Sequence, residues 1–485
     1  MGFLVVMYLI FMPLAFASFF LEGVRIEFAL IFASLIASGW MLAFLSGKIG
    51  IRRADRWSLW FWLFIAFGVV SLIASPYVSA SYTKGIVQIA GVAAMVSASL
   101  YISRVVASDP SRLLFYVRIL VLIITLVAGI GLWQSLASNL LHLNSLADFS
   151  FLARLVGSEE VWRDPGYIGS LKRTNSIASE PAHFVQILGI PGGLALLRLG
   201  LMGGSLSKST AMIMPRWAAL VIIGGFVVAI SIVGYVLLAL TIVSLMMVLH
   251  RSEVRYFLRY ALVCVITGVA YRLLLSWLGE EFALKLETIP LIFSGATGGQ
   301  VASTESLSAL TVSANLSVAL KNLGNNPFLG VGPGGHPLSY GELVPGWVIH
   351  APGLYGLNQE DAASLLIRLL SETGLVGTIL FLTGWLVLVV RARQAIQSAL
   401  TFHVKNSLQP SPALAAAIGL TASCIALFVT FLLRSAAYFD PRLWVLMALT
   451  AAVPPLLARE RQRLLEGRKI PAPRPTRRVL IRRRT

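Results

Sequence analysis

The sequence has 485 residues, of which 57% are hydrophobic and only 12% are charged, and its mean hydropathy is +0.82. A soluble protein of this composition would expose more apolar surface than it can hide, so a membrane protein is predicted. The formal net charge is +18, but the Lys and Arg residues are spread over short loops and the C-terminal tail. That spread favours orientation against an anionic bilayer over nucleic-acid binding as the reason for the charge.

Many apolar stretches are long enough to span a bilayer, because about 30 Å of hydrocarbon at 1.5 Å per residue requires roughly 20 residues. The first stretch has no basic n-region and no Ala-x-Ala cleavage site, so we expect a retained helix and not a signal peptide. The expected spans in chain order are Phe3–Leu21, Ile26–Ser46, Trp57–Ser75, Gly85–Val106, Leu113–Ala137, Ala182–Leu201, Trp217–Ile230, Ile232–His250, Tyr256–Leu278, Ala362–Val390, Ala413–Leu433 and Leu443–Ala458.

These stretches predict an all-α fold, a polytopic bundle of about 12 transmembrane helices with a large extracytoplasmic loop that contains an amphipathic helix. The expected divisions are the first five helices (1–137), a first extracytoplasmic segment (138–181), helices six to nine (182–278), the large loop (279–361), helices ten to twelve (362–458) and a basic cytoplasmic tail (459–485).

The loop cations all fall on one side of the membrane if the N-terminus is cytoplasmic, which predicts that both termini are cytoplasmic. These cations are Lys48, Arg52, Arg53, Arg56, Arg104, Arg112, Arg198, Lys208, Arg216, Arg251, Arg255, Arg259, Arg391, Arg393 and Lys405, with the tail from Arg459 to Arg484. The tail also contains three prolines and is expected to be disordered. Cys264 and Cys424 both lie in apolar runs, so neither a metal cluster nor a disulfide framework is expected.

The first long segment ends in Lys172-Arg173-Thr-Asn-Ser-Ile-Ala-Ser-Glu180-Pro181, at the edge of the sixth span. Pro181 suits the first turn of a helix. Arg173 and Glu180 lie at the membrane boundary and are expected to line a polar cavity. The alternative is an interfacial anchoring Arg and a Glu that complements the helix dipole.

The larger loop contains a predicted helix, Ser303–Leu323, with apolar residues recurring on one face, a possible Ser303 cap and Gly324 after it. A Gly-rich turn, 325–335, follows the helix. The backbone amides of Gly332 and Gly334 are candidates to approach an anion, and a plain tight turn is the alternative.

Arg368 and Glu372 are spaced one helical turn apart in the tenth span, which predicts an ion pair between them. Asn358, Glu360 and Asp361 are expected to cap this helix, whose N-terminus offers free amides to an anion. The alternatives are that the ion pair is purely structural and that the capping residues serve only the helix.

His336 and His350 are the histidines of the large loop. His350 precedes the tenth helix and is a candidate general base, while a surface imidazole without function is the alternative.

Several motifs together resemble the O-antigen ligase and polysaccharide polymerase superfamily of bacterial inner-membrane glycosyltransferases. The motifs are Asn326-Pro-Phe-Leu-Gly-Val-Gly-Pro-Gly334, then Asn358, then Ser371-Glu-Thr-Gly-Leu-Val-Gly377, with Arg173, Ser176, Glu180-Pro181, and Ser231, Gly234 and Tyr235. The resemblance implies a glycan donor on a polyprenyl diphosphate at the outer leaflet of the bacterial inner membrane, with the active site facing the periplasm. It also implies an acceptor that is either another lipid-linked repeat unit, for a polymerase, or lipid A core, for a ligase. Ligases have an Arg in the amphipathic helix, where Leu310 or Thr311 stands here, and a His where Leu357 stands, so a polymerase is favoured.

Under this interpretation the expected catalytic residues are Arg173, Glu180 and His350, with a cation on the diphosphate and a base on the attacking hydroxyl. No Asp-x-Asp motif lies outside the predicted spans, so no metal and no other cofactor are expected. The expected substrate-binding residues are Lys172, Gly332, Gly334, His336 and Asn358, and the expected supporting residues are Asp361, Arg368 and Glu372; Trp347 and Tyr355 are candidates to stack on sugars. The rival class is a transporter or flippase, which requires broken helices, an internal repeat and deep charges.

Overall fold

The computed structural model describes residues 2–13, 18–21, 24–47, 53–149, 167–168, 171–178, 180–249, 307–350, 353–434 and 437–469. These residues form 16 α-helices. They also form two short antiparallel hairpins, β1 (Ser18–Leu21) with β2 (Val24–Glu27) and β3 (Tyr167–Ile168) with β4 (Leu171–Lys172). The architecture is therefore helical, as expected, with two small hairpins that the sequence patterns did not predict.

Seven helices of the described residues are long and apolar enough to cross a membrane. Their segments are Phe28–Leu45 (α2), Val78–Ala107 (α4), Pro110–Leu140 (α5, Pro110–Ser135, with a π-helical turn), Ile232–Leu249 (α11), Leu365–Lys405 (α18), Pro412–Leu433 (α19) and Pro441–Glu466 (within α20, Pro441–Lys469). Three shorter apolar helices accompany them, α1 (Gly2–Phe11), α3 (Trp57–Ile73) and α10 (Arg216–Val228). The chain is thus a polytopic helical membrane protein. The expected ninth span, Tyr256–Leu278, lies outside the described residues.

Helix α19 is the centre of the bundle. It packs against α8 (Pro181–Arg198), α11, α18 and α20, and almost all of its residues are buried. The approach to α8 is close enough that a Cβ on Gly193 would lie 2.3 Å from the carbonyl oxygen of Gly419. Small residues allow such contact in bilayers, where packing replaces the hydrophobic effect as the force between helices.

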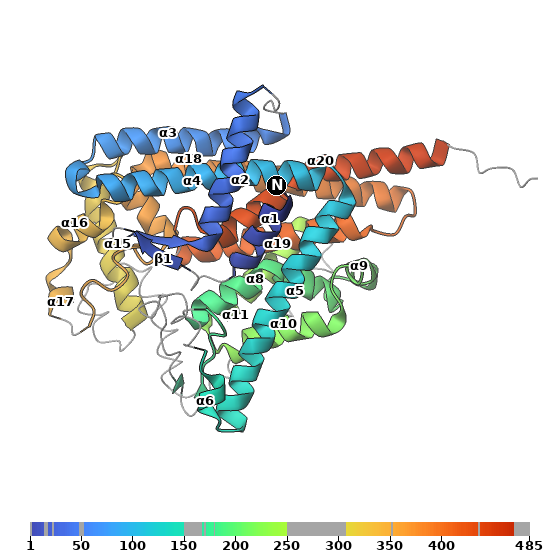
Figure 1. Ribbon diagram of the computed structural model, residues 1–485, viewed down its shortest axis with the longest axis horizontal. Coiled ribbons are helices and arrows are strands. Elements are labelled where there is room, and N and C mark those ends of the chain that lie inside the picture. Colours follow the sequence, from blue (N-terminus) through green and yellow to red (C-terminus); the bar gives the residue numbers. More distant parts are fainter. Residues whose placement is uncertain are drawn as a thin grey trace, which may run out of the picture.

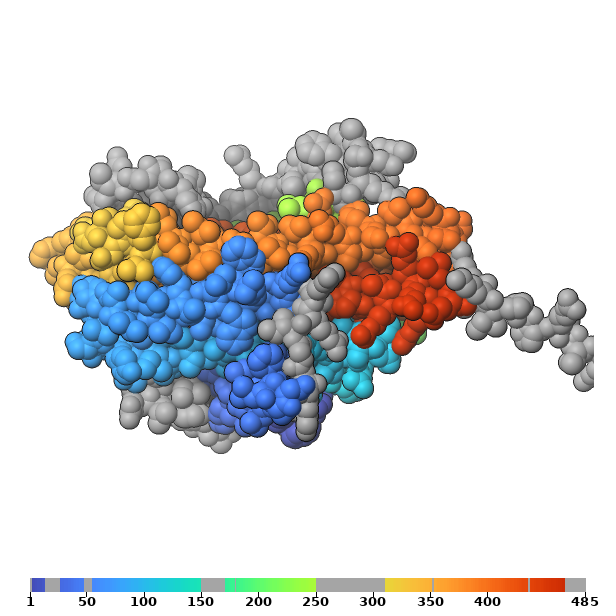
Figure 2. Space-filling model, turned by 90° about the horizontal axis from the view of Figure 1, so that it is seen from above, coloured from blue at the N-terminus to red at the C-terminus, as the bar shows by residue number. Residues whose placement is uncertain are grey.

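The two ends of the molecule differ in character. Helices α15 (Leu307–Asn325), α16 (His336–Leu343) and α17 (Gly346–Ile349) lie at one end, and the C-terminal part of α20 projects from the other (Figure 1). Figure 2 shows the same separation, with the yellow residues of α15 to α17 opposite the red C-terminal residues. We call these the loop end and the basic end.

The basic end gathers the loop cations. Arg459 Nη1 donates to Ala107 O, which joins the end of α4 to α20. Helix α9 (Gly204–Thr210) contacts the turn after α18 through a hydrogen bond from Ser209 Oγ to Pro410 O. Most of the described loop cations that were predicted to share one side lie on the elements joined here.

At the loop end, α15 buries its apolar face in a small separate core. Leu310, Ala314 and Val318 pack there against Tyr340, Val344, Val348 and Leu354 of α16, α17 and the following turn. The amphipathic helix of the large loop is therefore confirmed, although it continues through Gly324 to Asn325. Its expected cap, Ser303, lies outside the described residues.

Two boundaries differ from the prediction. The first helix ends at Phe11 and not at Leu21, because Pro13 cannot donate the next helical hydrogen bond and Ser18–Leu21 pairs as a strand instead. The last helix continues beyond Ala458 to Lys469, so the start of the expected disordered tail is helical. This extension consists mainly of strong helix formers, and Gln462 Nε2 donates to Glu466 Oε1 at 2.8 Å along it.

A break between α10 and α11 and two short elements complete the fold. Helix α10 ends at Val228 and α11 begins at Ile232, which confirms the predicted break around Ser231. The short helix α6 (Asn144–Ala147) and the 3₁₀ turn Arg53–Arg56 complete the described elements.

Candidate functional site

Helix α18 is broken near the loop end, where the sequence predicted a continuous span. Gly374 has φ 59° and ψ −163°, far from helical values. A Cβ on Gly374 would lie 2.6 Å from Phe328 O, so glycine is required by conformation and by space. The break leaves backbone groups of α18 without helical partners, which must be satisfied by another segment.

The Gly-rich turn supplies those partners. Val331 N donates to Ser371 O and Gly332 N donates to Glu372 O, each at 2.9 Å. Beyond the break, Leu375 N donates to Pro327 O at 2.9 Å. The turn therefore acts as a short stretch of backbone inserted into a broken helix.

Ser71 of α3 and Ser75, just after that helix, hold the other side of the turn. Ser71 Oγ donates to Leu329 O at 2.6 Å, and Ser75 Oγ donates to Val331 O. These contacts correct the anion-cradle interpretation of the turn, since the amide of Gly332 already has a carbonyl partner. Gly334 packs against α4, where a Cβ would lie 3.0 Å from Gly85 N. The tight-turn alternative therefore holds for Gly332, and the anion-binding role of Gly334 stays a prediction.

A buried ionic cluster lies beside the break. Arg368 Nε is 3.3 Å from Glu372 Oε2, which confirms the predicted ion pair. Tyr438 donates from its hydroxyl to the same carboxylate oxygen at 2.6 Å, and the Arg368 guanidinium lies over its ring at 4.8 Å from the centroid. Glu372 Oε1 has no hydrogen-bond partner among the described residues. Asp361 acts electrostatically on Arg368 from the preceding turn.

The start of α18 corrects another expectation. The helix begins at Leu365, and Ser364 is its N-cap, with Oγ accepting from Ile367 N at 3.1 Å. Asn358, Glu360 and Asp361 therefore do not cap it. Asp361 Oδ1 instead accepts from Ala363 N at 3.0 Å within the turn, and Glu360 pairs with Lys84 of α4.

His336 is buried in a hydrogen-bond network that joins α15, α16 and α18. Its Nδ1 lies 2.8 Å from Ser371 Oγ and its Nε2 lies 3.0 Å from Asn315 Oδ1. Asn322 Nδ2 donates to both Ser371 Oγ and Ser339 Oγ. Burial lowers the pKa of His336 to about 3, and the positive charges of Arg368 and Lys84 add to that shift. A neutral imidazole with both nitrogens occupied does not bind a diphosphate, which corrects its assignment as a substrate-binding residue.

The segment before α8 is anchored by hydrogen bonds from its backbone and its hydroxyl side chains. Lys172 N donates to Asn139 Oδ1 at 2.7 Å, and Ser176 Oγ donates to Val127 O at 2.6 Å. Thr174 Oγ1 donates to Val228 O at 3.0 Å. The segment is thus fixed to α5 and α10, and Pro181 begins α8 as predicted.

Arg173 occupies this anchored segment with its side chain half-buried. Burial lowers the pKa of Arg173, the Glu180 carboxylate opposes that shift, and the positive charge of Arg434, at the end of α19, adds to it. Arg173 Nε has no hydrogen-bond partner among the described residues. Arg173 therefore lies within electrostatic range of one carboxylate, Glu180, and of a second guanidinium, Arg434.

The C-terminal end of α19 links the segment of Arg434 to the start of α18, which carries Arg368. Ser364 Oγ, at the N-cap of α18, donates to Leu432 O at 2.9 Å, two residues before Arg434. Arg368 lies four residues after Ser364, so the arginines follow one another across the loop end of the bundle. We call Arg173, Glu180 and Arg434 the arginine site.

Several polar residues of this end were missed by the sequence analysis. Arg442 is buried, pairs with Asp440, and donates from Nη1 to Gln186 Oε1 of α8 at 2.8 Å. Arg434 and Tyr438 precede it in the short connection between α19 and α20, and Arg442 itself lies in the first turn of α20. The available signal was four charged or phenolic residues within a connection between two apolar spans.

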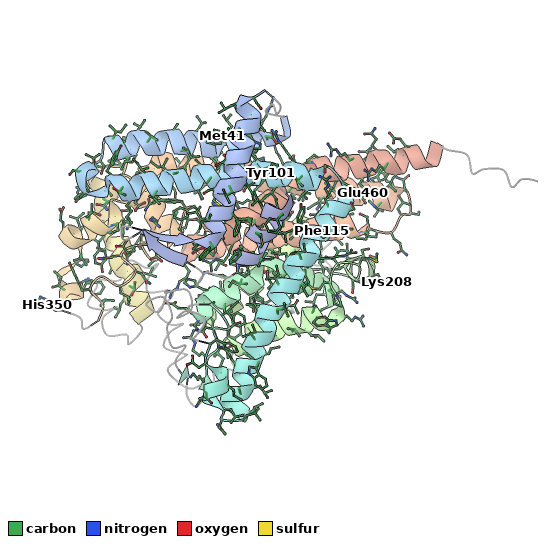
Figure 3. All side chains as sticks on the ribbon, in the orientation of Figure 1. Met41, Tyr101, Phe115, Lys208, His350 and Glu460 are labelled. Atoms are coloured by element: carbon green, nitrogen blue, oxygen red, sulfur yellow. The ribbon has the colours of Figure 1, made fainter. Side chains whose placement is uncertain are left out.

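Other predicted site residues lie apart from the arginine site. His350 is exposed at the outer edge of the loop end (Figure 3). Asn358 is in a turn with φ 55°. Arg173 and Glu180 therefore lie within electrostatic range of each other, whereas His350 lies at the exposed outer edge of the loop end.

A metal site is not present in the part of the chain that the structure describes, where no three His, Cys, Asp or Glu side chains group suitably. Neither a scan against protein-family models nor a search of curated proteins found a match to this sequence. Function therefore has to be inferred from the arrangement of these residues and from the sequence motifs.

Proposed function

We propose that this protein is a membrane glycosyltransferase that acts on a glycan carried by a polyprenyl diphosphate. The supporting observation is the half-buried Arg173, whose Nε has no partner among the described residues and which lies within electrostatic range of Arg434 at the same end of the bundle. An anion bound at Arg173 would offset the like charge of Arg434 and accept hydrogen bonds from the free guanidinium donor. A diphosphate suits paired guanidinium groups because its oxygens accept bidentate hydrogen bonds.

The proposed reaction is an inverting displacement. An acceptor sugar hydroxyl attacks the anomeric carbon of the donor, and the bond from that carbon to the diphosphate oxygen breaks. The diphosphate leaves with the bonding electron pair, and the guanidinium groups of Arg173 and Arg434 stabilise its charge. Glu180 takes the hydroxyl proton, and it is preferred to His350 because it lies beside Arg173.

The acceptor is proposed to be a second lipid-linked repeat unit, which makes the enzyme a polysaccharide polymerase. This choice rests on the sequence motifs, where Leu357 stands in the place of the histidine of ligases. A ligase that uses lipid A core as acceptor is the alternative.

The orientation is inferred from charge. The basic end carries the loop cations, which remain on the cytoplasmic side in most membrane proteins. The loop end and the arginine site would then face the periplasm in a bacterial inner membrane. Tyr355, exposed on this end, and Trp347, half-buried there, are available to stack on sugar rings.

A transporter or flippase is the second candidate, because α18 is broken at Gly374 beside the buried Arg368 and Glu372. Discontinuous helices with nearby charges are typical of transporter substrate sites. Incubation of purified protein in detergent with a polyprenyl-diphosphate repeat unit separates the two classes. Longer glycans support the enzyme, whereas unchanged substrate in detergent together with movement across liposome membranes supports the carrier.

A further inference from the structure

The basic end contains three arginines that converge on one turn of backbone, residues 211–215, between α9 and α10. Arg118 of α5 donates from Nε to Met212 O at 3.0 Å. Arg198, the last residue of α8, donates from Nε to Met214 O at 2.9 Å. Two side chains from different helices are therefore fixed to carbonyl groups two residues apart, with their guanidinium planes held at the same turn.

Arg216 follows this turn and begins α10. It lies close enough to Arg198 to act on it as a like charge. The N-terminus of α10 adds its own partial positive charge at the same place. No ion pair neutralises Arg118, Arg198 or Arg216 within the described part of the chain. The turn is therefore a concentrated cationic centre with no carboxylate partner in the described part of the chain.

Apolar side chains surround this centre and face outward. Met212 and Trp217, on either side of Arg216, are 60% and 59% exposed. Phe115 is exposed one turn from Arg118 on α5. Figure 3 shows Phe115 and Lys208 of α9 toward the same end of the molecule, away from His350. A tryptophan beside arginines at the end of apolar helices is typical of the membrane interface.

An exposed apolar track leads away from the arginines. Helices α5 and α10 pack together and run in the same direction, because Arg118 meets the turn before α10 while the 174–176 segment bonds Val127 and Val228 at the far ends. Exposed apolar residues continue along both helices beyond the cationic centre; they are Leu122, Leu126, Leu220 and Val227. A ligand with an anionic head and apolar chains matches both parts of this surface.

We propose that the arginines Arg118, Arg198 and Arg216 form a binding site for the phosphate of an anionic phospholipid, with its acyl chains along α5 and α10. Basic sites between helices at the cytoplasmic surface bind such headgroups through charge and hydrogen bonds. The arginine fork bonds phosphate oxygens through two donors at once. This inference depends only on membrane insertion and is independent of the proposed glycosyl transfer.

Native mass spectrometry of the full chain, released from detergent with added dioleoyl phosphatidylglycerol or dioleoyl phosphatidylcholine, tests the site. We expect phosphatidylglycerol to be retained more tightly than phosphatidylcholine. R118Q and R216Q should each weaken its binding about fivefold, the effect of roughly 1 kcal/mol per lost cation. R56Q, an exposed arginine of the 3₁₀ turn Arg53–Arg56, is the matched control and should bind as the unchanged protein does.

Two further measurements keep the test decisive if a variant folds poorly. Raising the salt concentration should weaken retention of phosphatidylglycerol by the unchanged protein and leave retention of phosphatidylcholine unaffected. Inorganic phosphate should not release the lipid, because it lacks the acyl chains. Equal retention of the two lipids, unchanged binding by R118Q and R216Q, or release by inorganic phosphate would each overturn the proposal.

Discussion

Nδ1 of His336 lies 2.8 Å from Oγ of Ser371, so the large loop is bonded directly to the residue that precedes Glu372 in the broken span. Nε2 of the same ring bonds Asn315 of α15 at 3.0 Å. One neutral imidazole therefore joins three helices at the loop end. The positions of the loop module and of the Arg368 cluster are linked by this ring.

Acidification is expected to destabilise the protein through His336. Its folded pKa of about 3 lies below the unfolded value, so below pH about 6.5 the unfolded state binds the proton and the native state does not. The contribution of His336 to the free energy of unfolding is fully present above pH about 6.5. It falls by at most ~1.4 kcal/mol per pH unit as the pH decreases toward 3. Thermal unfolding of the detergent-solubilised protein at pH 7 and pH 5 measures this. H336N should lose less stability than the unchanged protein over the same interval, and an equal loss would contradict the prediction.

Removal of the Glu372 charge is expected to destabilise the protein strongly. E372Q leaves the buried Arg368 guanidinium without its carboxylate, which costs about 3 to 5 kcal/mol in buried pairs. Y438F removes one hydrogen bond to the same carboxylate and should cost about 1.5 to 3 kcal/mol. Denaturant unfolding of the two single variants and the double variant gives their coupling energy. If the two losses simply add, the contact between Tyr438 and Glu372 does not contribute.

Alanine at position 374 is expected to disrupt the broken helix. G374A places a Cβ 2.6 Å from Phe328 O in a backbone conformation that L residues avoid, at a cost of at least ~2 kcal/mol. G129A is the matched control, because that glycine lies in α5 with open space around it and alanine is the better helix former. Melting temperatures of both variants provide the comparison. Equal melting temperatures would mean that the inserted turn does not require the break.

Much of the bundle could be predicted from the sequence, because long apolar runs are local signals that the bilayer imposes. The Arg368 and Glu372 pair was equally visible as a spacing on one helix face. The break at Gly374 was not, because it depends on a backbone pairing with residues 327–332, more than 40 positions away in the chain. Periodicity carries no information about such a partner.

The candidate site was predicted only in part for the same reason. Arg173 and Glu180 lie seven residues apart and were found together, whereas Arg434 joins them from the far end of α19. His336 was assigned to substrate because an isolated histidine in a loop gives no sign of its burial. The Ser364 cap was overlooked because Asp361 and Asn358, three and six residues earlier, are equally good capping types.

The central claim is that Arg173 stabilises a diphosphate leaving group, and glycan transfer from a polyprenyl-diphosphate donor by purified variants tests it most directly. R173A should reduce the turnover rate about 100-fold or more, as loss of a group on a developing oxyanion does, while keeping the melting temperature. R173K should recover only part of the rate, since a lysine keeps the charge but not the two-pronged hydrogen bonding, and R463A at the basic end should transfer normally. Full turnover by a folded R173A variant would contradict the account.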